Sequence, residues 1–579
     1  ARVEVKQCMP TGNTTKLYPG VGGVLGFADT ATQAATSTAV TTNYYDLTNY
    51  GDVSATVSSY TGETTTKVHS PVQPYIGGVI GTSASANANC DFKNIKNYGN
   101  VTLSGKIGNG AALGGAIGYV RTYTGSHIYN YGKVTAENAE IFYLYMGGAV
   151  AIGAKTTALR EVHNYGEVYT AESATCGYFV GGGVLGYQGS SFANADSANS
   201  YIRNSSNSGP INISHNDFAD NLHDGTAMYY RVGGISGWTQ NYIENCNNLK
   251  GGTITCTGNI HQCDESIYSV CIGGLVGYKT VSAISDSHND ADVISKINMT
   301  TNEGYALGDV RLNIGGITGY NHLPCSNITN NGTVSVEGNL AGQLRLGGVC
   351  GHANGVSTNL PVSDNCVNNG KVIVKSGTRI GYQMMVGGVA SYLHKNSNCT
   401  NNGSVIIEDD VQWGHTHAYI GGVAAYACGL SENMTNNGPV TIGKNCSFST
   451  ANPENLYIGG VIGQLYSDAD GIVNTEKGVI TLEESTYASF VLGGGCIGTA
   501  PASNAKATEQ VNFFIKNVTN YGAINSYASH SAKLGFYIGG CFGYLYEETI
   551  NGTLTSPDVD NAHNYGPITI KGDDHYTVK

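Results

Sequence analysis

A six-residue motif, apolar-Gly-Gly-apolar-x-Gly, recurs fourteen times along the 579 residues and restricts the possible folds more than any other feature. Successive copies start 32 to 55 residues apart. A unit that repeats at this period cannot bury its own apolar face, so the copies must stack and share a core. The Gly-Gly pairs start at Gly22, Gly77, Gly114, Gly147, Gly182, Gly233, Gly273, Gly315, Gly347, Gly387, Gly421, Gly459, Gly494 and Gly539.

Two positions of this motif carry a structural prediction. The residue after the Gly-Gly pair is apolar in all fourteen copies, which indicates a continuous buried row. The third Gly is replaced only by Ala151, Ser391 and Ala425. Such a strict requirement for a small residue predicts that two backbones approach closely at this position.

A second motif, Asn-(Tyr/Asn/Ser)-Gly-x-(Val/Ile), alternates with the first. Asn followed closely by Gly favours the left-handed backbone of a tight corner, and the β-branched residue that follows favours a strand. The motif therefore predicts a turn that feeds a strand. It occurs eleven times, at Asn49, Asn97, Asn130, Asn164, Asn207, Asn330, Asn368, Asn401, Asn436, Asn520 and Asn564.

These repeats predict an all-β fold, a parallel β-solenoid of about fourteen irregular repeats, for which we expect the right-handed form. The composition agrees, because 81 Gly and only 12% charged residues accompany 41% hydrophobic residues and 39 Tyr, which excludes collagen and a disordered chain. A β-propeller-like array is the alternative, but its blades typically number four to eight. We expect one continuous repeat domain over 1–579, as a segment of a longer chain, because repeats run towards both ends.

Residues 273–278 read Gly-Gly-Leu-Val-Gly-Tyr, residues 315–320 read Gly-Gly-Ile-Thr-Gly-Tyr, and residues 325–334 read Cys-Ser-Asn-Ile-Thr-Asn-Asn-Gly-Thr-Val. With these motifs the chain resembles the bacterial GLUG-type repeat surface proteins, some of which accompany immunoglobulin-A-cleaving peptidases. The resemblance implies a secreted or surface-exposed, adhesin-like β-solenoid. The peptidase activity is not implied, because the sequence contains no HExxH motif.

Charge and cysteine content limit the partners and cofactors. The net charge is −13 and no Lys/Arg cluster occurs, so we expect no nucleic acid partner, and no apolar run reaches the ~18 residues of a membrane span. None of the 15 Cys forms a CxxC motif, so we expect no cofactor and no metal site. Cys246, Cys325, Cys366 and Cys399 precede Asn-rich turns, where stacked buried thiols or disulfides between neighbouring repeats would both fit.

Aromatic residues are the main candidates for binding. An aromatic follows the third Gly in nine copies, and such a row could be either buried packing or an exposed strip that contacts sugar rings or protein. The candidate binding residues are Tyr119, Tyr187, Trp238, Tyr278, Tyr320, Tyr392, Tyr426 and, outside the motif, Trp413.

The only candidate for catalysis is a cluster near Trp413. Asp409 and Asp410 supply carboxylates, and His415 and His417 would share a strand face. Two imidazoles without a third ligand nearby favour ordinary loop histidines over a metal pair. We therefore expect no enzyme, with a polysaccharide lyase or hydrolase as the alternative, which would need two convergent carboxylates about 5 to 10 Å apart.

Together these patterns predict a secreted or cell-surface structural and adhesive protein, such as a stalk, an adhesin or a filament subunit. It would bind a glycan or a surface protein through its lateral face and through variable loops such as 213–228, and could associate end to end. A non-catalytic glycan-binding protein is a further alternative. Many Asn occur in Asn-x-Ser/Thr triplets, including Asn331 and Asn402, and we expect ladders of stacked Asn inside the solenoid rather than glycan attachment.

Overall fold

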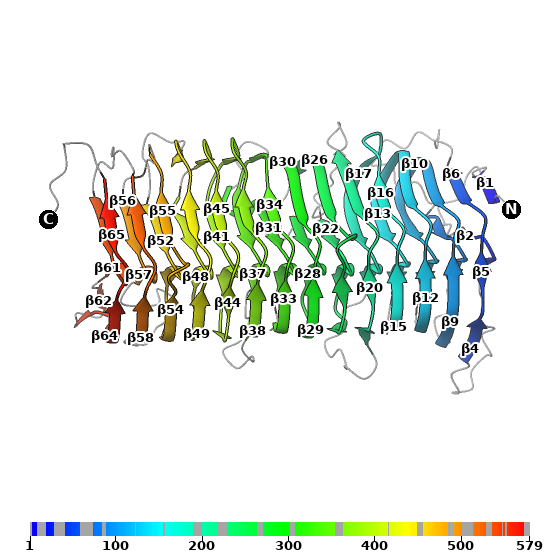
Figure 1. Ribbon diagram of the computed structural model, residues 1–579. Helices are drawn as coiled ribbons and strands as arrows, with labels where there is room; N and C mark the ends of the chain where they lie inside the picture. Colours follow the sequence, from blue (N-terminus) through cyan, green and yellow to red (C-terminus); the bar gives the residue numbers. More distant parts are fainter. Residues whose placement is uncertain are drawn as a thin grey trace. The chain divides into compact units, whose positions relative to one another are not determined.

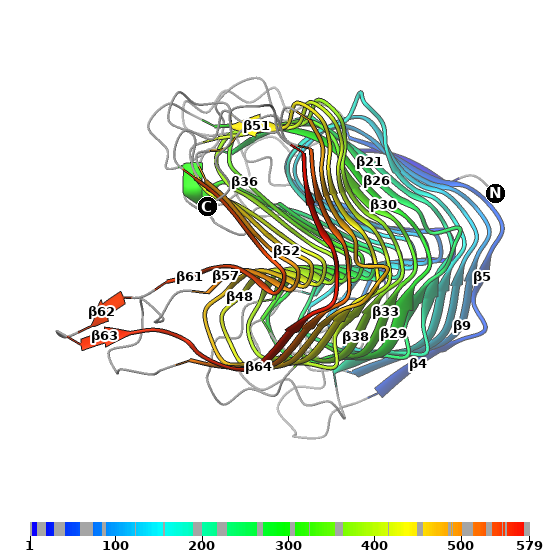
Figure 2. The same cartoon turned by 60° about the vertical axis from the view of Figure 1, so that its left-hand side comes forward.

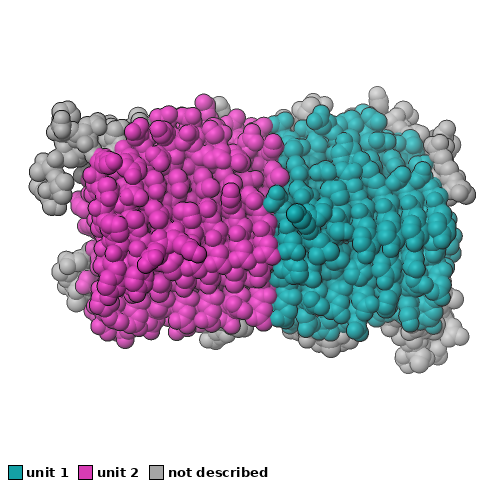
Figure 3. Space-filling view, in the orientation of Figure 1, with its two compact units in different colours: residues 1–292 teal, residues 293–579 magenta. Residues whose placement is uncertain are grey.

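The structure of the chain is a computed structural model. It describes residues 3–7, 19–27, 41–57, 73–83, 89–121, 123–154, 157–188, 200–216, 229–262, 270–301, 307–322, 325–353, 363–414, 416–448, 455–484, 488, 490–500, 513–527, 535–546, 548–550 and 553–571. The chain divides into two compact units, 1–292 and 293–579 (Figure 3). Each unit is a stack of coils, and each coil contributes strands to three parallel sheets (Figure 1).

We name the three sheets by their place in the coil. The long face runs from the Asn corner to the Gly-Gly pair, the short face follows that pair, and the corner face leads into the next Asn corner. In unit 2, Figure 2 shows the long-face strands β36 (Gln343–Gly347) and β52 (Asn455–Gly459) meeting the short-face strands β48 (Ala424–Ala427) and β57 (Ile497–Ala500) at a sharp bend. This bend lies at the Gly-Gly pair.

In unit 1 the strands are distributed over the faces as follows. The long face holds β1 (Val3–Gln7), β2 (Gly20–Gly22), β6 (Val53–Val57), β7 (Tyr75–Gly77), β10 (Val101–Gly114), β13 (Val134–Gly147), β16 (Val168–Thr170), β17 (Thr175–Gly182), β21 (Ile211–Asn216), β22 (Tyr230–Gly233), β26 (Ile254–Gln262) and β27 (Val270–Gly273). The short face holds β3 (Leu25–Phe27), β8 (Ile80–Ser83), β11 (Ile117–Val120), β14 (Val150–Gly153), β18 (Leu185–Gln188), β23 (Ser236–Thr239) and β28 (Val276–Lys279). The corner face holds β4 (Thr41–Tyr45), β5 (Thr48–Asn49), β9 (Asn89–Asn97), β12 (Tyr123–Asn130), β15 (Thr157–Asn164), β19 (Tyr201–Arg203), β20 (Ser206–Asn207), β24 (Tyr242–Glu244), β25 (Asn247–Asn248) and β29 (Ile284–Asn289).

Unit 2 repeats this arrangement with shorter strands. Its long face holds β30 (Val293–Thr301), β31 (Arg311–Gly315), β34 (Val334–Val336), β35 (Asn339–Leu340), β36, β39 (Val372–Val374), β40 (Arg379–Ile380), β41 (Met384–Gly387), β45 (Val405–Ile407), β46 (Gln412–Trp413), β47 (Ala418–Gly421), β50 (Val440–Ile442), β51 (Ser447–Phe448), β52, β55 (Ile480–Leu482), β56 (Phe490–Gly494), β59 (Ile524–Ser526), β60 (Gly535–Gly539) and β65 (Ile568–Ile570). Its short face holds β32 (Thr318–Asn321), β37 (Cys350–Ala353), β42 (Ala390–Leu393), β48, β53 (Ile462–Leu465), β57 and β61 (Phe542–Leu545). Its corner face holds β33 (Cys325–Asn330), β38 (Ser363–Asn368), β43 (Asn396–Ser397), β44 (Thr400–Asn401), β49 (Ser431–Asn436), β54 (Ala469–Asn474), β58 (Phe514–Asn520) and β64 (Asp558–Asn564). A hairpin of β62 (Glu548–Ile550) and β63 (Thr553–Thr555) and a 3-10 turn η1 (Leu307–Asp309) complete the described elements.

The strand pairing confirms the predicted parallel β-solenoid. Equivalent residues of successive coils pair in register, for example Val101 with Val134 and Val134 with Val168. Among the described strands, the hairpin β62–β63 is the one antiparallel pair. This parallel stacking excludes the propeller alternative, whose blades are separate four-stranded sheets. The right-handed form, the single domain over 1–579 and the longer parent chain stay predictions.

A column of asparagines runs along each unit at the Asn corner, and all of its members except Asn564 are buried. In each coil Nδ2 donates to the carbonyl oxygen of the turn that follows and to Oδ1 of the next Asn in the column, as in Asn97 to Asn130 at 2.9 Å. The column consists of Asn49, Asn97, Asn130, Asn164, Asn207, Asn248 and Asn289 in unit 1, and of Asn330, Asn368, Asn401, Asn436, Asn474, Asn520 and Asn564 in unit 2.

The Gly-Gly pair packs directly against this column. A Cβ placed on Gly78 would lie 2.3 Å from Cγ of Asn97, and one placed on Gly422 would lie 2.4 Å from Cγ of Asn436. Real Cβ atoms do not approach so closely, so only Gly fits beside the amide. The two sequence motifs therefore meet inside the core.

At the third Gly of the first motif two backbones approach closely, as the restriction of this position to small residues predicts. A Cβ on Gly118 would lie 2.7 Å from the backbone nitrogen of Ile76 on the long face. The apolar row after the Gly-Gly pair is also confirmed, because it is buried in thirteen of its fourteen positions. Val24 is the exception, with 42% of its surface exposed.

Three members of the Asn column were missed by the sequence motif. Asn248 and Asn474 donate to the carbonyl oxygens of Gly252 and Gly478, four residues on, because their turns are longer. Asn289 donates to the carbonyl oxygen of Ala291, which stands where the motif requires Gly. The Asn amide therefore requires a backbone carbonyl oxygen in the turn, but it does not require the Gly of the motif at a fixed spacing.

A second regularity lies three residues before each column Asn. At this position thirteen coils have a non-glycine residue with φ between 49° and 58°, and the fourteenth has Gly471 with φ 71°. Asn and Asp predominate because their short side chains tolerate this left-handed backbone. Several also bond to a neighbouring coil, for example Asn245 Nδ2 to Asn204 Oδ1 at 2.9 Å.

The expected loop 213–228 begins later than predicted. Residues 211–216 form strand β21, which pairs with β26 from Ile211 to Asn216. Residues 217–228 lie outside the described residues.

Replacing one column asparagine tests the importance of the ladder. Asn401→Ala removes donors to Gly403 O and Asn436 Oδ1 and the acceptor for Asn368 Nδ2, all of them buried. We expect a loss of about 3 kcal/mol in unfolding free energy, because the partners lose their hydrogen bonds inside the core. The measurement is the shift of the guanidinium unfolding midpoint.

Asn402→Ala is the matched control, because the neighbouring Asn402 also bonds to its counterparts, Asn369 and Asn437, but is exposed to solvent. Its loss should stay within about 0.5 kcal/mol. Equal losses in the two variants would contradict a special role of the buried column.

Candidate functional site

The aromatics that follow the third Gly lie in the bend between the long and short faces. In unit 1, Tyr119 stacks on Tyr75 of the long face with ring centroids 4.5 Å apart, and Tyr187 contacts Tyr145 at 5.0 Å. Tyr119 and Tyr187 are half-buried, while Tyr75 is buried. These predicted binding residues therefore pack against a second aromatic row on the long face.

Trp238 and Tyr278 surround a buried arginine in the same bend. The guanidinium carbon of Arg231 lies 4.1 Å from the ring centroid of Trp238, 3.6 Å from that of Tyr278 and 4.0 Å from that of Tyr229. Arg231 has 2% of its surface exposed and Tyr278 has 7%, whereas Trp238 and Tyr229 are half-buried. We name Arg231, Trp238, Tyr229 and Tyr278 the arginine cage.

Burial dominates the electrostatics around this cage. It raises the pKa of Tyr145, Tyr178 and Tyr187, and the positive charge of Arg231 opposes part of that rise in all three. The three phenols therefore stay neutral at physiological pH, and the field of Arg231 extends to each of them.

In unit 2 the equivalent row forms a continuous stack. Tyr320 stacks on His352 at 4.9 Å, His352 on Tyr392 at 4.6 Å, and Tyr392 on Tyr426 at 5.0 Å, with interplanar angles of 8° to 11°. Tyr320 is buried, and Tyr392 and Tyr426 are half-buried. The row thus combines internal packing with partial exposure to solvent, a mixture of the two roles that the sequence left open.

Trp413 lies apart from these rows. Its side chain is fully buried and contacts the edge of Phe448 at 5.3 Å between ring centroids. A ring with no exposed surface packs the core and cannot contact a ligand from solvent. The cluster that the sequence grouped around Trp413 is therefore divided between the inside and the outside of the coil.

The acidic members of that cluster are exposed turn residues. Asp409 Oδ1 accepts from the backbone nitrogen of Lys444, and Asp410 Oδ1 accepts from Asn445 Nδ2 in the next coil. His417 Nδ1 accepts from the backbone nitrogen of Asn455. His415 lies outside the described residues. The described members thus hold neighbouring coils together.

A row of exposed tyrosines on the Asn corner of unit 1 was not singled out by the sequence. Tyr50, Tyr98, Tyr131 and Tyr165 each follow a column Asn, and 42% to 79% of their surface is exposed. Successive rings stack 4.7 to 5.1 Å apart with interplanar angles of 3° to 5°. We name these four residues the tyrosine row. The sequence feature that could have identified this row is the variable residue between Asn and Gly in the second motif, which is Tyr in these four coils.

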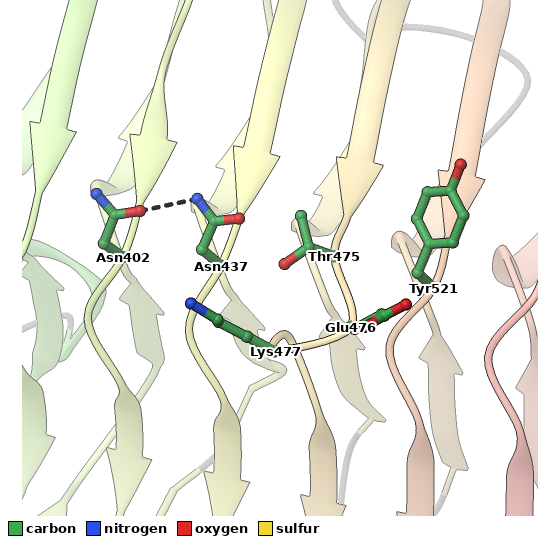
Figure 4. Close-up of a pocket in the computed structure, with 6 residues that line it drawn as sticks. All are labelled: Asn402, Asn437, Thr475, Glu476, Lys477 and Tyr521. Atoms are coloured by element: carbon green, nitrogen blue, oxygen red, sulfur yellow. Dashed lines mark hydrogen bonds between the residues drawn. The ribbon is translucent and has the colours of Figure 1, made fainter.

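In unit 2 the same corner position carries amides. Asn369 Nδ2 donates to Asn331, Asn402 to Asn369, and Asn437 to Asn402, so Asn331 and Asn402 form a ladder on the surface and not inside the solenoid as predicted. Beyond Asn437 the row passes Thr475 and reaches Tyr521 beside a surface hollow of about 650 Å³, which Glu476 and Lys477 also line (Figure 4).

A second hollow, of about 590 Å³, gathers charged residues on the corner face of unit 1. Arg160 pairs in register with Arg203, and Arg203 with Glu244, while Asp286 and Tyr201 also line the hollow. Arg203 Nε lies 2.6 Å from Glu244 Oε2. Sequence reasoning missed this cluster because its members are 41 to 43 residues apart and belong to no common motif.

The cysteines are mainly core residues. The structure shows no disulfide among the thirteen described cysteines, and all but Cys428 are buried. Burial raises the pKa of Cys246, Cys256 and Cys446 to about 12. Of the two arrangements that the sequence left open, the described residues show the buried thiols.

No family model, curated protein or solved structure matches this chain. Across the described ranges, no group of three His, Cys, Asp or Glu residues is arranged to hold a metal ion. Within the same ranges, no helix has the length and apolar character needed to cross a bilayer.

The stacked histidine makes a prediction about acid stability. Burial, followed by the charges of Arg345 and Arg311, holds the pKa of His352 well below its usual value. The unfolded chain then binds a proton below about pH 6.5 that the folded chain does not, so folding stability falls by up to about 1.4 kcal/mol per pH unit below that point. We expect His352→Gln to reduce the drop in melting temperature between pH 7 and pH 5.

His563→Gln, at an exposed histidine, is the control and should leave that drop unchanged. An identical acid response of the His352→Gln variant and the unmodified chain would rule out this role of His352.

Proposed function

We propose that the chain is a secreted or cell-surface structural and adhesive β-solenoid that binds a partner protein through its lateral face. The tyrosine row is the observation that carries the proposal. Tyrosine is enriched at protein interfaces, and monomeric proteins rarely expose a contiguous row of large aromatic side chains. The resemblance to bacterial GLUG-type surface proteins supports the cellular location.

The geometry of the tyrosine row favours a protein over a glycan as its partner. Rings that stack 4.7 to 5.1 Å apart and almost parallel cover one another's faces. A sugar ring stacks on an aromatic face, which the inner rings of this row no longer offer. Their exposed edges and hydroxyl groups can instead pack against apolar side chains and bond to backbone groups of a protein.

Polar and charged groups next to the row complete such an interface. Lys133 Nζ pairs with Glu167 at 2.9 Å and lies 3.9 Å from the ring centroid of Tyr169, while Tyr129 stacks on His163 at 5.5 Å. Stable protein interfaces combine an aromatic centre with a polar rim of this kind.

Substitution of two inner rings tests the proposal. We expect the double variant Tyr98→Ser/Tyr131→Ser to attach at least about tenfold more weakly, because interface tyrosines often contribute 1 kcal/mol or more each. The measurement is the attachment of beads coated with the chain to surfaces coated with individual extracellular-matrix proteins, compared with surfaces coated with neutral polysaccharide.

The matched control is Asn369→Ser/Asn402→Ser, at the same coil position in unit 2, which should attach normally. Circular dichroism and the melting temperature verify that both variants keep the fold. Undiminished attachment of the tyrosine variant, or preferential attachment of the unmodified chain to neutral polysaccharide, would overturn the proposal.

The charged hollow favours a carbohydrate-active enzyme as a second candidate function. A lyase or hydrolase needs carboxylates beside arginine and an aromatic, and Glu244, Asp286, Arg160, Arg203 and Tyr201 line one hollow. If the hollow is catalytic, Glu244→Gln should abolish the release of reducing ends from a panel of polysaccharides. Absence of any release by the unmodified chain would remove this candidate.

A further inference from the structure

We propose that the arginine cage of unit 1 binds the carboxylate of an acidic sugar, such as a uronic acid unit of a polysaccharide. The cage lies in the bend at the Gly-Gly pair, whereas the tyrosine row lies at the Asn corner. The proposal therefore stands on different residues from the proposed protein interface and does not depend on it.

The cage concentrates hydrogen-bond donors that the described residues leave unpaired. Nε and Nη1 of Arg231 and Nε1 of Trp238 are all buried, and none has a hydrogen-bond partner among the described residues. The ion pairs formed by the described residues also do not include Arg231. A buried cation without a paired carboxylate is costly, and aromatic faces compensate only part of that cost.

The unpaired groups define the ligand chemistry. All three are N–H donors, so a ligand must supply acceptors and preferably a negative charge. A carboxylate can accept charge-assisted hydrogen bonds from the guanidinium nitrogens, which are among the strongest hydrogen bonds that proteins form. Trp238 Nε1 can donate to a hydroxyl or ring oxygen of the same sugar.

The arrangement of the rings favours a sugar as the carrier of this carboxylate. Trp238 meets Tyr187 at 60°, Tyr229 at 62° and Tyr278 at 88°, so these rings contact one another edge to face and do not stack in parallel. Trp238, Tyr187 and Tyr229 are half-buried and therefore accessible from solvent. Tilted, partly exposed aromatics can stack on a sugar ring while the guanidinium holds its acid group.

The same row in unit 2 lacks these properties. Arg345 occupies the position equivalent to Arg231, but its Nη1 contacts Nδ1 of His352. The aromatics beside it stack at 8° to 11° and cover one another. The combination of unpaired donors with edge-to-face rings is thus a property of the coils around Arg231 and not of the repeat in general.

The chain contains only two tryptophans, which gives the test a direct optical signal. Trp413 is fully buried, so a ligand-induced change in tryptophan fluorescence reports on Trp238, and Trp413→Phe isolates that signal. The probe is a tetrasaccharide of galacturonic acid, titrated against the full chain in parallel with its methyl-esterified form. Affinities come from the fluorescence titration and from calorimetry.

We expect the acid form to bind and the ester to bind at least about tenfold more weakly, because esterification removes the charge-assisted hydrogen bonds. Arg231→Gln should cause a similar loss, and Arg231→Lys a smaller one. Arg379→Gln, at an exposed arginine, is the control and should bind normally.

Tetraglutamate and sodium sulfate test the other sources of an anion. Equal affinity for tetraglutamate would indicate that the ligand is an acidic peptide and not a sugar. Equal affinity for sulfate would indicate a site that binds anions in general. Either result overturns the proposal. It also fails if the unmodified chain does not bind the tetrasaccharide, or if the ester binds as tightly as the acid. The ester comparison uses the unmodified chain, so it remains decisive should Arg231→Gln not fold.

Discussion

The buried column of asparagine amides is the interaction on which the rest of the structure depends. Each amide bonds both to its own turn and to the amide of the next coil, as Asn130 does with Gly132 O and Asn164 Oδ1. Leaving such a group unpaired in the core costs about 1 to 3 kcal/mol, so the column fixes the register of every corner. The Gly-Gly pair follows from it, because no side chain fits beside the amide.

Parallel stacking in register places equivalent positions of successive coils about 4.8 Å apart, and this spacing governs the surface as well as the core. Opposite charges meet at several such positions, as in Lys106 with Glu140 and Lys375 with Glu408. Arg160 lies beside a like charge, Arg203, which in turn pairs with Glu244. Aromatic rings, by contrast, can stack on one another at this spacing, which stabilises the row. The tyrosine row and the Tyr320–His352–Tyr392 stack are therefore consequences of the same repeat.

The sequence predicted the fold well because its motifs report local requirements. Each requirement fixes a residue type at a regular spacing: Gly beside the amide, Asn before a turn, and an apolar residue after the Gly-Gly pair. The candidate sites were less predictable. Arg231 and Trp238 are only seven residues apart, but Tyr278, which lies close to both, belongs to the neighbouring coil. Arg203 and Glu244 are likewise 41 residues apart in the sequence and meet only because successive coils stack.

Alone, the sequence determined the solenoid class and the row of apolar residues in the core, since both depend on residue types at short and regular intervals. Which aromatic rings face solvent and which charges meet was decided only by the tertiary structure. Trp413 and Tyr50 illustrate the difference, because one is fully buried and the other 79% exposed. The strand period alone does not distinguish inside from outside where Gly-rich bends interrupt it, and contacts between coils depend on loop lengths that vary from copy to copy.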